Sequence, residues 1–181
     1  TRWLSDWSSD VCSSDLGAYV IDLDHSSVVA RVLHRGLSYN VVRFGVSEGA
    51  LDWNPENPSA IALDVKVNTT PYYAPIVYNI LPEGPQFLNV QAFPEARFVS
   101  TAVHAADDGR AVVEGSLTLM GVTKPAIINA ELVGIGRSID GTRMIGFTGT
   151  MIIDWDDYVA PSAAPSLGRV TVVLDAEFMP R

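Results

Sequence analysis

The sequence predicts an all-β domain, a sandwich or a barrel, with about eight or nine strands. Apolar and polar residues alternate with a period of two over most of the chain, as they do in strands that bury one face. Glycine, proline, asparagine and aspartate separate these segments at a spacing typical of all-β folds. The length of 181 residues is that of one domain with a sizeable interior.

The first part of the chain predicts four strands. The segment 18–22 is short and apolar. In 28–34, alternate residues form an apolar face that ends in His34. The long segment 41–53 is interrupted by two glycines, which indicate bends or bulges. The segment 61–68 alternates regularly between apolar and polar residues, as expected of a strand with one buried face.

A short helix is predicted over 72–81, where the strand pattern is interrupted. Pro75 would lie in its first turn, where a missing N–H costs little. Its apolar face would carry Tyr73, Ile76, Val77 and Ile80. A second helical turn is predicted over 86–90. Both would form a lid or plug at one mouth of a barrel.

The remaining strands are predicted over 98–103, 112–119, 125–133, 143–154 and 170–178. A turn at 107–109 joins the first two of them. Gly121 tolerates the positive φ that a tight turn needs, and Pro125 suits the first position of the following strand because it lacks an N–H donor. A surface loop is predicted over 160–166.

The first sixteen residues differ from the rest of the chain and show no usable period. The run 10–16 resembles the translation of a sequencing-library adapter. We therefore hypothesise that 1–16 is a non-native segment and that 17–181 is the domain, with a disordered native tail as the alternative. Under this hypothesis the segment has replaced any signal peptide, so the sequence cannot be used to argue against export.

Composition excludes several classes of partner. The formal net charge of −9 would repel a phosphate backbone, so nucleic acid is not an expected partner. The same charge weakens attraction to anionic headgroups, and no run approaches the ~18 apolar residues of a membrane-spanning helix, so stable membrane insertion is not expected. The single Cys12 cannot form an internal disulfide.

Four segments occur in an order that is typical of a known family. They are 19–38, with Ile21-Asp22, His25-Ser26 and His34-Arg35-Gly36-Leu37-Ser38; 49–53, before an Asn-Pro turn; 93–101; and 115–125, with Gly-Val-Thr-Lys-Pro. A weaker match covers 146–158. Together they resemble the YceI-like family of lipocalin-like, polyisoprenoid-binding proteins. The chain departs from the family pattern at Trp155, where arginine is usual, and at Val159, where glycine is usual.

The resemblance implies an extended, lipocalin-like antiparallel barrel of about eight strands, with one or two short helices near one mouth and a long apolar tunnel. It implies non-enzymatic binding or transport of a long-chain isoprenoid or another amphiphilic lipid, in the periplasm or outside the cell. The ligand would be a polyisoprenoid, an isoprenoid quinone or a fatty amide, with no other cofactor. Because each buried methylene contributes about 0.8 kcal/mol to the binding free energy, a ligand with a long tail needs few polar contacts to bind tightly.

Three alternatives to a lipid carrier stay open. The first is an enzyme that acts on an enclosed lipid, with His34 or an acidic loop residue as general base. The second is a quinone-binding accessory module for membrane electron transport, with a membrane cytochrome as partner. The third is a domain whose core is filled. A homodimer is compatible with each of them.

The predicted ligand contacts combine inward-facing strand residues, lid residues and one histidine. They are His34, Phe44, Ile76, Val77, Ile80, Phe87, Phe93, Phe98, Leu117, Leu119, Phe147 and Phe178. His34 could donate to a headgroup or a quinone oxygen, with a structural histidine as the alternative. Each apolar residue could equally belong to an ordinary core.

No catalytic or metal-ligating group is predicted. His25 and Ser26 are adjacent, so on a strand they would point to opposite faces and could not act as a pair. His25, His34 and His104 are widely separated and lack the compact spacing of metal ligands. The acidic residues in 154–157 lack the glycine and terminal glutamate of an EF-hand loop, which favours a solvated loop.

Overall fold

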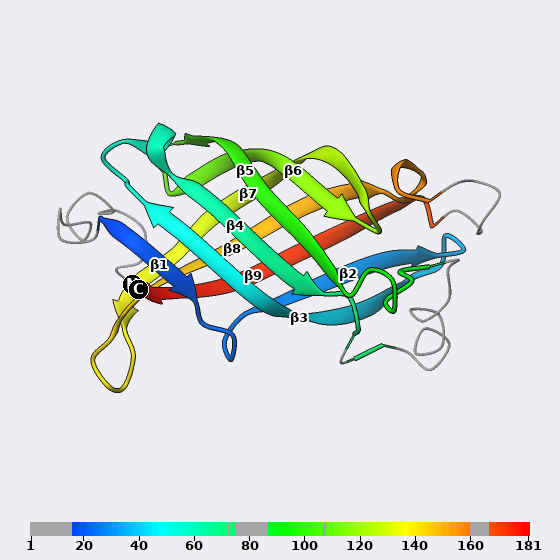
Figure 1. Cartoon of the computed structure of the whole chain (residues 1–181), viewed down its shortest axis with the longest axis horizontal. Helices are drawn as coiled ribbons and strands as arrows, with labels where there is room; N and C mark the ends of the chain where they lie inside the picture. The colour runs from blue at the N-terminus through cyan, green and yellow to red at the C-terminus, as the bar shows by residue number, and fades with distance from the viewer. Residues whose placement is uncertain (1–15, 72, 75–86, 107, 160–166) are drawn as a thin grey trace.

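The computed structural model describes residues 16–71, 73–74, 87–106, 108–159 and 167–181, and within them the chain is almost entirely β-structure (Figure 1). The strands are β1 (Gly17–Ile21), β2 (Ser27–His34), β3 (Ser38–Trp53), β4 (Ala62–Asn68), β5 (Glu95–Ala105), β6 (Arg110–Leu119), β7 (Val122–Arg137), β8 (Arg143–Asp154) and β9 (Arg169–Pro180). Two single-turn 3₁₀ helices, η2 (Pro58–Ala60) and η3 (Trp155–Asp157), lie between them. The predicted all-β class is confirmed.

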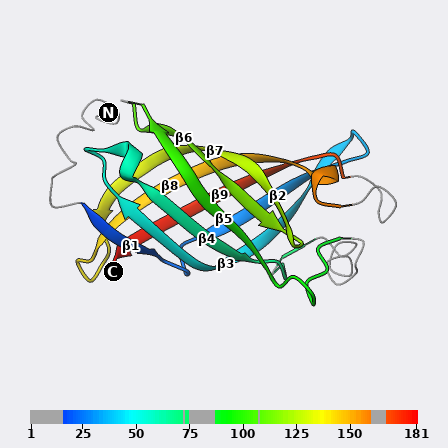
Figure 2. The same ribbon diagram turned by 45° about the horizontal axis from the view of Figure 1, so that its top comes forward.

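The strands close into an antiparallel barrel, which resolves the choice between sandwich and barrel (Figure 2). Strands β3 to β9 are consecutive neighbours around the wall. The eighth position is shared by β1 and β2, because both pair with β3 on one side and with β9 on the other. They run in the same direction, so they form one barrel strand that is interrupted by the loop 22–26.

Two tight turns follow the rules of β-hairpins. Arg35 and Gly36 between β2 and β3 have φ angles of 53° and 74°, and Met120 and Gly121 between β6 and β7 have φ angles of 50° and 75°. Positive φ at both central residues is the geometry whose twist matches that of the flanking strands. The predicted role of Gly121 is therefore confirmed.

Pro125 lies inside β7 and not at its start as predicted. It pairs with Ser116 of β6, whereas β7 acquires β8 as its second neighbour only from Ile128 onward. The missing N–H therefore leaves no hydrogen bond to β8 unmade. The irregularity predicted in the third strand is a register shift between Val46 and Glu48, where β3 pairs with β4.

The barrel interior is formed by two hydrophobic clusters. The first contains Ile145, which is fully buried, together with Leu132 and Phe178. The second contains Phe98 and Leu117. Each strand contributes alternate residues to this interior, as the period of two requires. The β5–β9 wall is thus lined by apolar side chains along its length.

The predicted helix over 72–81 falls largely outside the described residues. Within it, Tyr73 forms an isolated β-bridge with Arg43, whose N–H donates to the Tyr73 carbonyl at 2.8 Å. The helical prediction is therefore wrong at Tyr73, because an open stretch of β3 offers it a strand partner. In the described part of the predicted second turn, 87–90, the chain forms turns and no helix. Just after it, the N–H groups of Ala92 and Phe93 both donate to the Asn89 carbonyl. The segment 1–15 and the loop 160–166 lie outside the described residues.

Candidate functional site

Three cavities follow one another along the barrel interior. We call them the apolar chamber, of about 160 Å³, the constriction, of about 60 Å³, and the large chamber, of about 580 Å³. The apolar chamber is lined by Val28, Ala30, Val32, Val42, Phe44, Val67, Thr69, Phe87, Leu88, Ala96, Leu117, Leu119, Met151, Ile153, Trp155, Leu167, Val170 and Val172. The large chamber lies at the other end, where it reaches Trp53, Glu56 and Arg110.

The constriction connects the two chambers through shared wall residues. With the apolar chamber it shares Val28, Val67, Leu117, Met151 and Val172; with the large chamber it shares Leu63, Ile128, Gly149 and Leu174. Its volume would hold only about two water molecules. The interior is therefore two spaces joined by a narrow waist.

The ring of Phe98 forms part of this waist. Phe98 is 5% exposed and lies against Gly115 of β6, where the absence of a side chain makes room for the ring. Gly149 of β8 makes similar room for Ile128, because an added Cβ would lie 2.8 Å from the Ile128 Cγ2. Two pairs in which a large side chain packs against a glycine therefore contribute to the wall of the waist.

The structure places seven of the predicted contacts on the cavities. Phe44, Phe87, Leu117 and Leu119 line the apolar chamber, Phe98 and Leu117 line the constriction, and Phe147 and Phe178 line the large chamber. The rings of Phe147 and Phe178 meet edge to face at 6.0 Å. Ile76, Val77 and Ile80 lie outside the described residues.

Two predicted contacts lie away from the three cavities. His34 continues the inward face of β2 by alternation, but it is the last residue of the strand and is exposed beside the turn. Phe93 packs below the β6–β7 turn, where its ring faces Gly121 and its carbonyl accepts from Thr69 Oγ1 at 2.6 Å. Both residues lie at an end of the barrel, whereas the predicted contacts that line the cavities lie within it.

Two tryptophans were missed by the sequence analysis. Trp53 lines the large chamber and Trp155 lines the apolar chamber. Both indole N–H groups are buried without a hydrogen-bond partner among the described residues, yet neither nitrogen is open to its chamber. We therefore treat both rings as apolar wall. Their positions at strand and turn ends gave no periodic signal that could have identified them.

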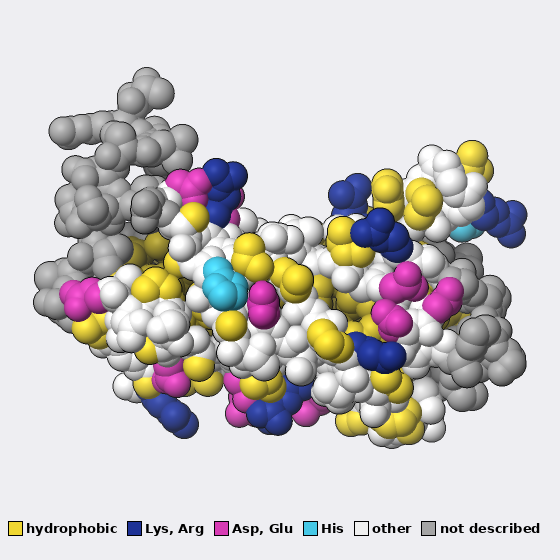
Figure 3. Space-filling model, turned by 90° about the horizontal axis from the view of Figure 1, so that it is seen from above, with side chains coloured by type: hydrophobic (Ala, Val, Ile, Leu, Met, Phe, Trp, Pro, Cys, Tyr) yellow, Lys and Arg dark blue, Asp and Glu magenta, His cyan; other side chains and the backbone are white. Residues whose placement is uncertain are grey.

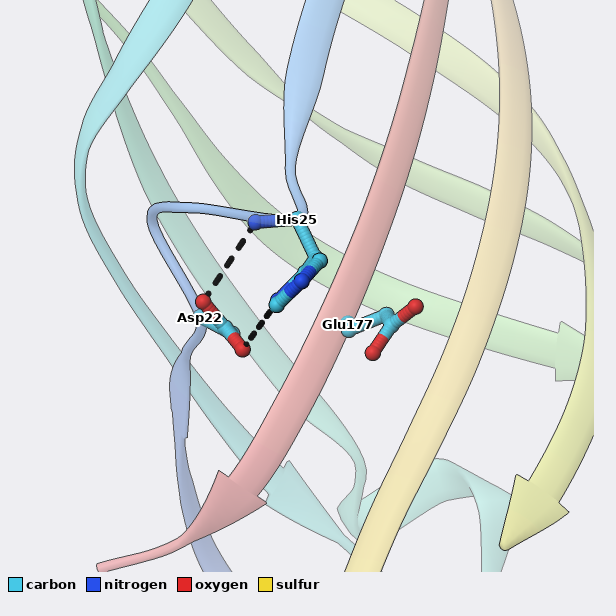
Figure 4. A group of neighbouring side chains, drawn as sticks. All are labelled: Asp22, His25 and Glu177. Atoms are coloured by element: carbon cyan, nitrogen blue, oxygen red, sulfur yellow. Dashed lines mark hydrogen bonds and ion pairs between the residues drawn. The ribbon is translucent and has the colours of Figure 1, made fainter. Parts of the chain in front are cut away.

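A polar cluster lies on the outside of the barrel, at the interruption between β1 and β2 (Figure 4). Candidate ligand atoms of Asp22, His25 and Glu177 lie within 4.8 Å of one another. A divalent cation could take such donors, but the loop already occupies Asp22: one oxygen accepts from the N–H of Asp24 and the other pairs with His25 Nδ1 at 2.8 Å. These hydrogen bonds instead hold together the loop 22–26 between β1 and β2.

His25 is expected to titrate above its ordinary pKa of 6.5. The hydrogen bond to Asp22 raises the pKa of His25, and the same bond lowers the pKa of Asp22 below 3.8. The stabilising contribution of His25 is therefore lost as pH rises through its raised pKa, and that of Asp22 is lost as pH falls through its lowered pKa. A proton NMR titration of the His25 ring checks this.

The matched variants are D22N and E177Q. D22N should lower the His25 midpoint clearly, whereas E177Q should lower it less, because Glu177 acts only through charge. An unchanged midpoint in D22N would contradict the assignment.

Comparison with known sequences gives consistent matches. The YceI-like domain model matches residues 19–178. A UPF0312 protein of Shewanella sp. strain ANA-3 is 41% identical over 165 residues, which cover 88% of this chain and 85% of that protein. A UPF0312 protein of Shewanella baltica strain OS155 is 39% identical over the same shares.

Solved structures share the fold. Burkholderia cenocepacia BcnA matches with a TM-score of 0.68 and 18% identity, over 87% of this chain and 98% of that one. A polyisoprenoid binding domain from Saccharophagus degradans, implicated in plant cell wall breakdown, matches with a TM-score of 0.63 and 14% identity, over 92% and 99%. A Campylobacter jejuni YceI protein matches with a TM-score of 0.61 and 19% identity, over 72% and 79%.

Proposed function

The chain belongs to the YceI-like domain family, and from this premise we propose that it binds a long-chain isoprenoid or another amphiphilic lipid inside its barrel, without covalent chemistry. The observation that carries the proposal is the row of two chambers and a waist along the barrel interior. The large chamber alone, at about 580 Å³, falls within the range of small-molecule sites. The shared fold of the polyisoprenoid binding domain from Saccharophagus degradans supports the same class of ligand.

The chemistry of the two chambers favours an amphiphile. Among the described residues that line the apolar chamber, Thr69 carries the one side-chain hydroxyl, and it already donates to the Phe93 carbonyl. The large chamber reaches Glu56 and Arg110 at its rim. A hydrocarbon tail would therefore lie toward the apolar chamber and a polar head toward Glu56 and Arg110, because an uncompensated polar group is costly to bury.

The lining residues give no support to an enzyme. Among the described residues, no histidine or cysteine lines any of the three cavities, and the one carboxylate on them is Glu56 at the rim. His34, the base considered for an enzyme, is exposed at the end of β2. A binding role needs none of these groups, because burial of the tail supplies the affinity.

We further propose that the protein carries its lipid through water, in the periplasm or outside the cell. An isoprenoid quinone would fit the same chambers as the other ligands. The membrane cytochrome partner and the homodimer stay predictions. Within the described residues, no helix is both long and apolar enough to cross a bilayer.

The native protein is expected to carry a lipid. Native mass spectrometry of protein purified from bacterial cells without detergent should show added mass that organic solvent removes. The stripped protein should then bind a long prenyl alcohol more tightly than a short one, because each additional buried methylene adds affinity. Empty protein that also fails to bind isoprenoid alcohols and fatty amides would refute the proposal.

The H34A variant separates a carrier from an enzyme. Because His34 lies outside the chambers, H34A should load lipid much as the unaltered protein does. The recovered lipid should have the same mass before and after incubation in both proteins. Turnover that is lost in H34A would favour the enzyme instead.

A further inference from the structure

The end of the β2–β3 hairpin exposes apolar side chains to solvent. Among the described residues, four of the thirteen exposed large hydrophobic side chains lie between 33 and 41. They are Leu33, Leu37, Tyr39 and Val41, of which Leu37 at the turn is 83% exposed. Leu33 pairs with Tyr39 in the ladder, so both side chains lie on the same face of the hairpin. Such clustering marks an interaction surface.

The same hairpin is basic although the chain is strongly acidic. The segment 27–44 carries Arg31, Arg35 and Arg43 and contains no aspartate or glutamate, whereas the whole chain has a net charge of −9. The Arg31 guanidinium lies 4.6 Å from the centre of the Tyr39 ring. Figure 3 shows basic and hydrophobic side chains together on the part of the molecule that projects at the upper right.

This surface lies at the end of the barrel that holds the apolar chamber. Val32 and Val42 line that chamber, and their sequence neighbours Leu33 and Val41 are exposed on the opposite face of the same strands. In Figures 1 and 2 the β2–β3 hairpin reaches the same end as η3, whose Trp155 also lines the chamber. The exposed patch and the chamber are thus separated by one wall.

We propose that the tip of the β2–β3 hairpin, residues 31–41, docks reversibly on an anionic phospholipid bilayer. Leucine and tyrosine side chains interleaved with arginine are the composition that binds the interface between headgroups and acyl chains. The arginines complement the negative surface of such a bilayer. This inference rests on the proposed function, since the bilayer would be the source or destination of the bound lipid.

Charges elsewhere on the molecule limit the contact to this hairpin. Asp156 and Asp157 of η3 are exposed at the same end of the barrel, and an anionic surface would repel them. The net negative charge of the remaining chain acts in the same direction. The docked state is therefore shallow, sensitive to salt and readily reversed, which suits a protein that must leave the bilayer with its cargo.

Vesicle flotation with two hairpin variants tests the proposal. The unaltered protein should float with vesicles of phosphatidylcholine and phosphatidylglycerol, and less with phosphatidylcholine alone or at high salt. L37D and R35D should each weaken binding by about tenfold or more, because the first removes an apolar anchor and the second reverses a charge. Aspartate tolerates the positive φ of position 35, so the turn is kept.

The matched control is I139D, since Ile139 is a fully exposed apolar residue in the β7–β8 connection, at the barrel end where the large chamber lies. Binding of I139D should equal that of the unaltered protein. Absence of binding to anionic vesicles, or an equal loss in I139D, would overturn the inference.

Loading with a prenyl alcohol from solution separates the two proposals. If L37D loads normally but no longer floats, the docking inference is supported; if the unaltered protein loads but never floats, docking alone fails. If the unaltered protein floats but never loads, the proposed function fails.

Discussion

Replacing Ala130 by tryptophan is expected to weaken lipid loading about tenfold or more, because the indole would take the place of at least two ligand methylenes, each of which contributes about 0.8 kcal/mol to binding when buried. Ala130 of β7 lines the large chamber, and its ladder partner on β6 is Ala111, which lines the same chamber. These two small side chains lie side by side on the inner face of the wall, and the space that they leave is part of the proposed site. An indole at position 130 would occupy this space and exclude a ligand.

The matched variant is N129W, on the neighbouring residue of the same strand. Asn129 is exposed, because successive side chains of a strand point to opposite faces. N129W should therefore load lipid as the unaltered protein does. Native mass spectrometry and calorimetric titration of stripped protein with a long prenyl alcohol measure loading, and thermal melting shows that both variants fold. Equal loading by A130W would mean that the large chamber does not hold the ligand.

The strands themselves could be predicted from the sequence because each has a buried face. Residues 143–154 were predicted as a strand, and β8 has the same bounds. In β9, predicted as a strand over 170–178, the alternate residues Val170, Ala176 and Phe178 are buried. Alternation is a local property of the chain, so it can be read without knowledge of any partner.

The way in which the strands assemble could not be predicted in the same way. The segments 18–22 and 28–34 were predicted as separate strands, and both exist, but they share one position in the barrel wall. That arrangement depends on where each of them meets β9, which is distant in sequence, and on where β1 meets the last part of β3. The Asp22 and His25 contacts that close the loop between them are consequences of this register.

Alternation identified residues of the cavity walls where the inward side chain lies well inside its strand. Phe44 and Leu119 lie on inward faces and line a chamber. Alternation along β2 also places His34 on the inward-facing side, but the strand ends at this residue, so the side chain is exposed to solvent. The waist depends on the contact between Phe98 and Gly115, which belongs to the pairing of β5 with β6 and leaves no trace in either segment alone.

Alanine at position 115 is expected to destabilise the protein by about 1–3 kcal/mol, the usual cost of overpacking. A Cβ at this position would lie 2.5 Å from the Val99 carbonyl oxygen and would overlap the Phe98 ring. The carbonyl belongs to β5, which is hydrogen-bonded to β6, so it cannot move without disturbing the ladder. The ring can move, but only toward the waist of the barrel. Urea unfolding measures the loss of stability.

Gly136 of β7 provides the matched control for the loss of a glycine. No atom lies within 4 Å of the Cβ position there, and its φ is in the ordinary range. G136A should therefore gain about 0.5–1 kcal/mol, because alanine loses less conformational freedom on folding than glycine. If G115A and G136A had the same effect on stability, the close packing of Phe98 against Gly115 would make no contribution to the free energy of unfolding.

The F98A background divides the cost of G115A between its two causes. Removal of the ring leaves only the Val99 carbonyl in conflict with the new Cβ. G115A should therefore lower the free energy of unfolding less in F98A than in the unaltered protein, although still by more than zero.

Displacement of the Phe98 ring by G115A should also narrow the waist. G115A is then expected to bind short prenyl alcohols, which fit the large chamber, better than long ones that must span the waist, whereas F98A should favour the long ones. The same chain-length preference in both variants would show that the waist does not determine which ligand length binds.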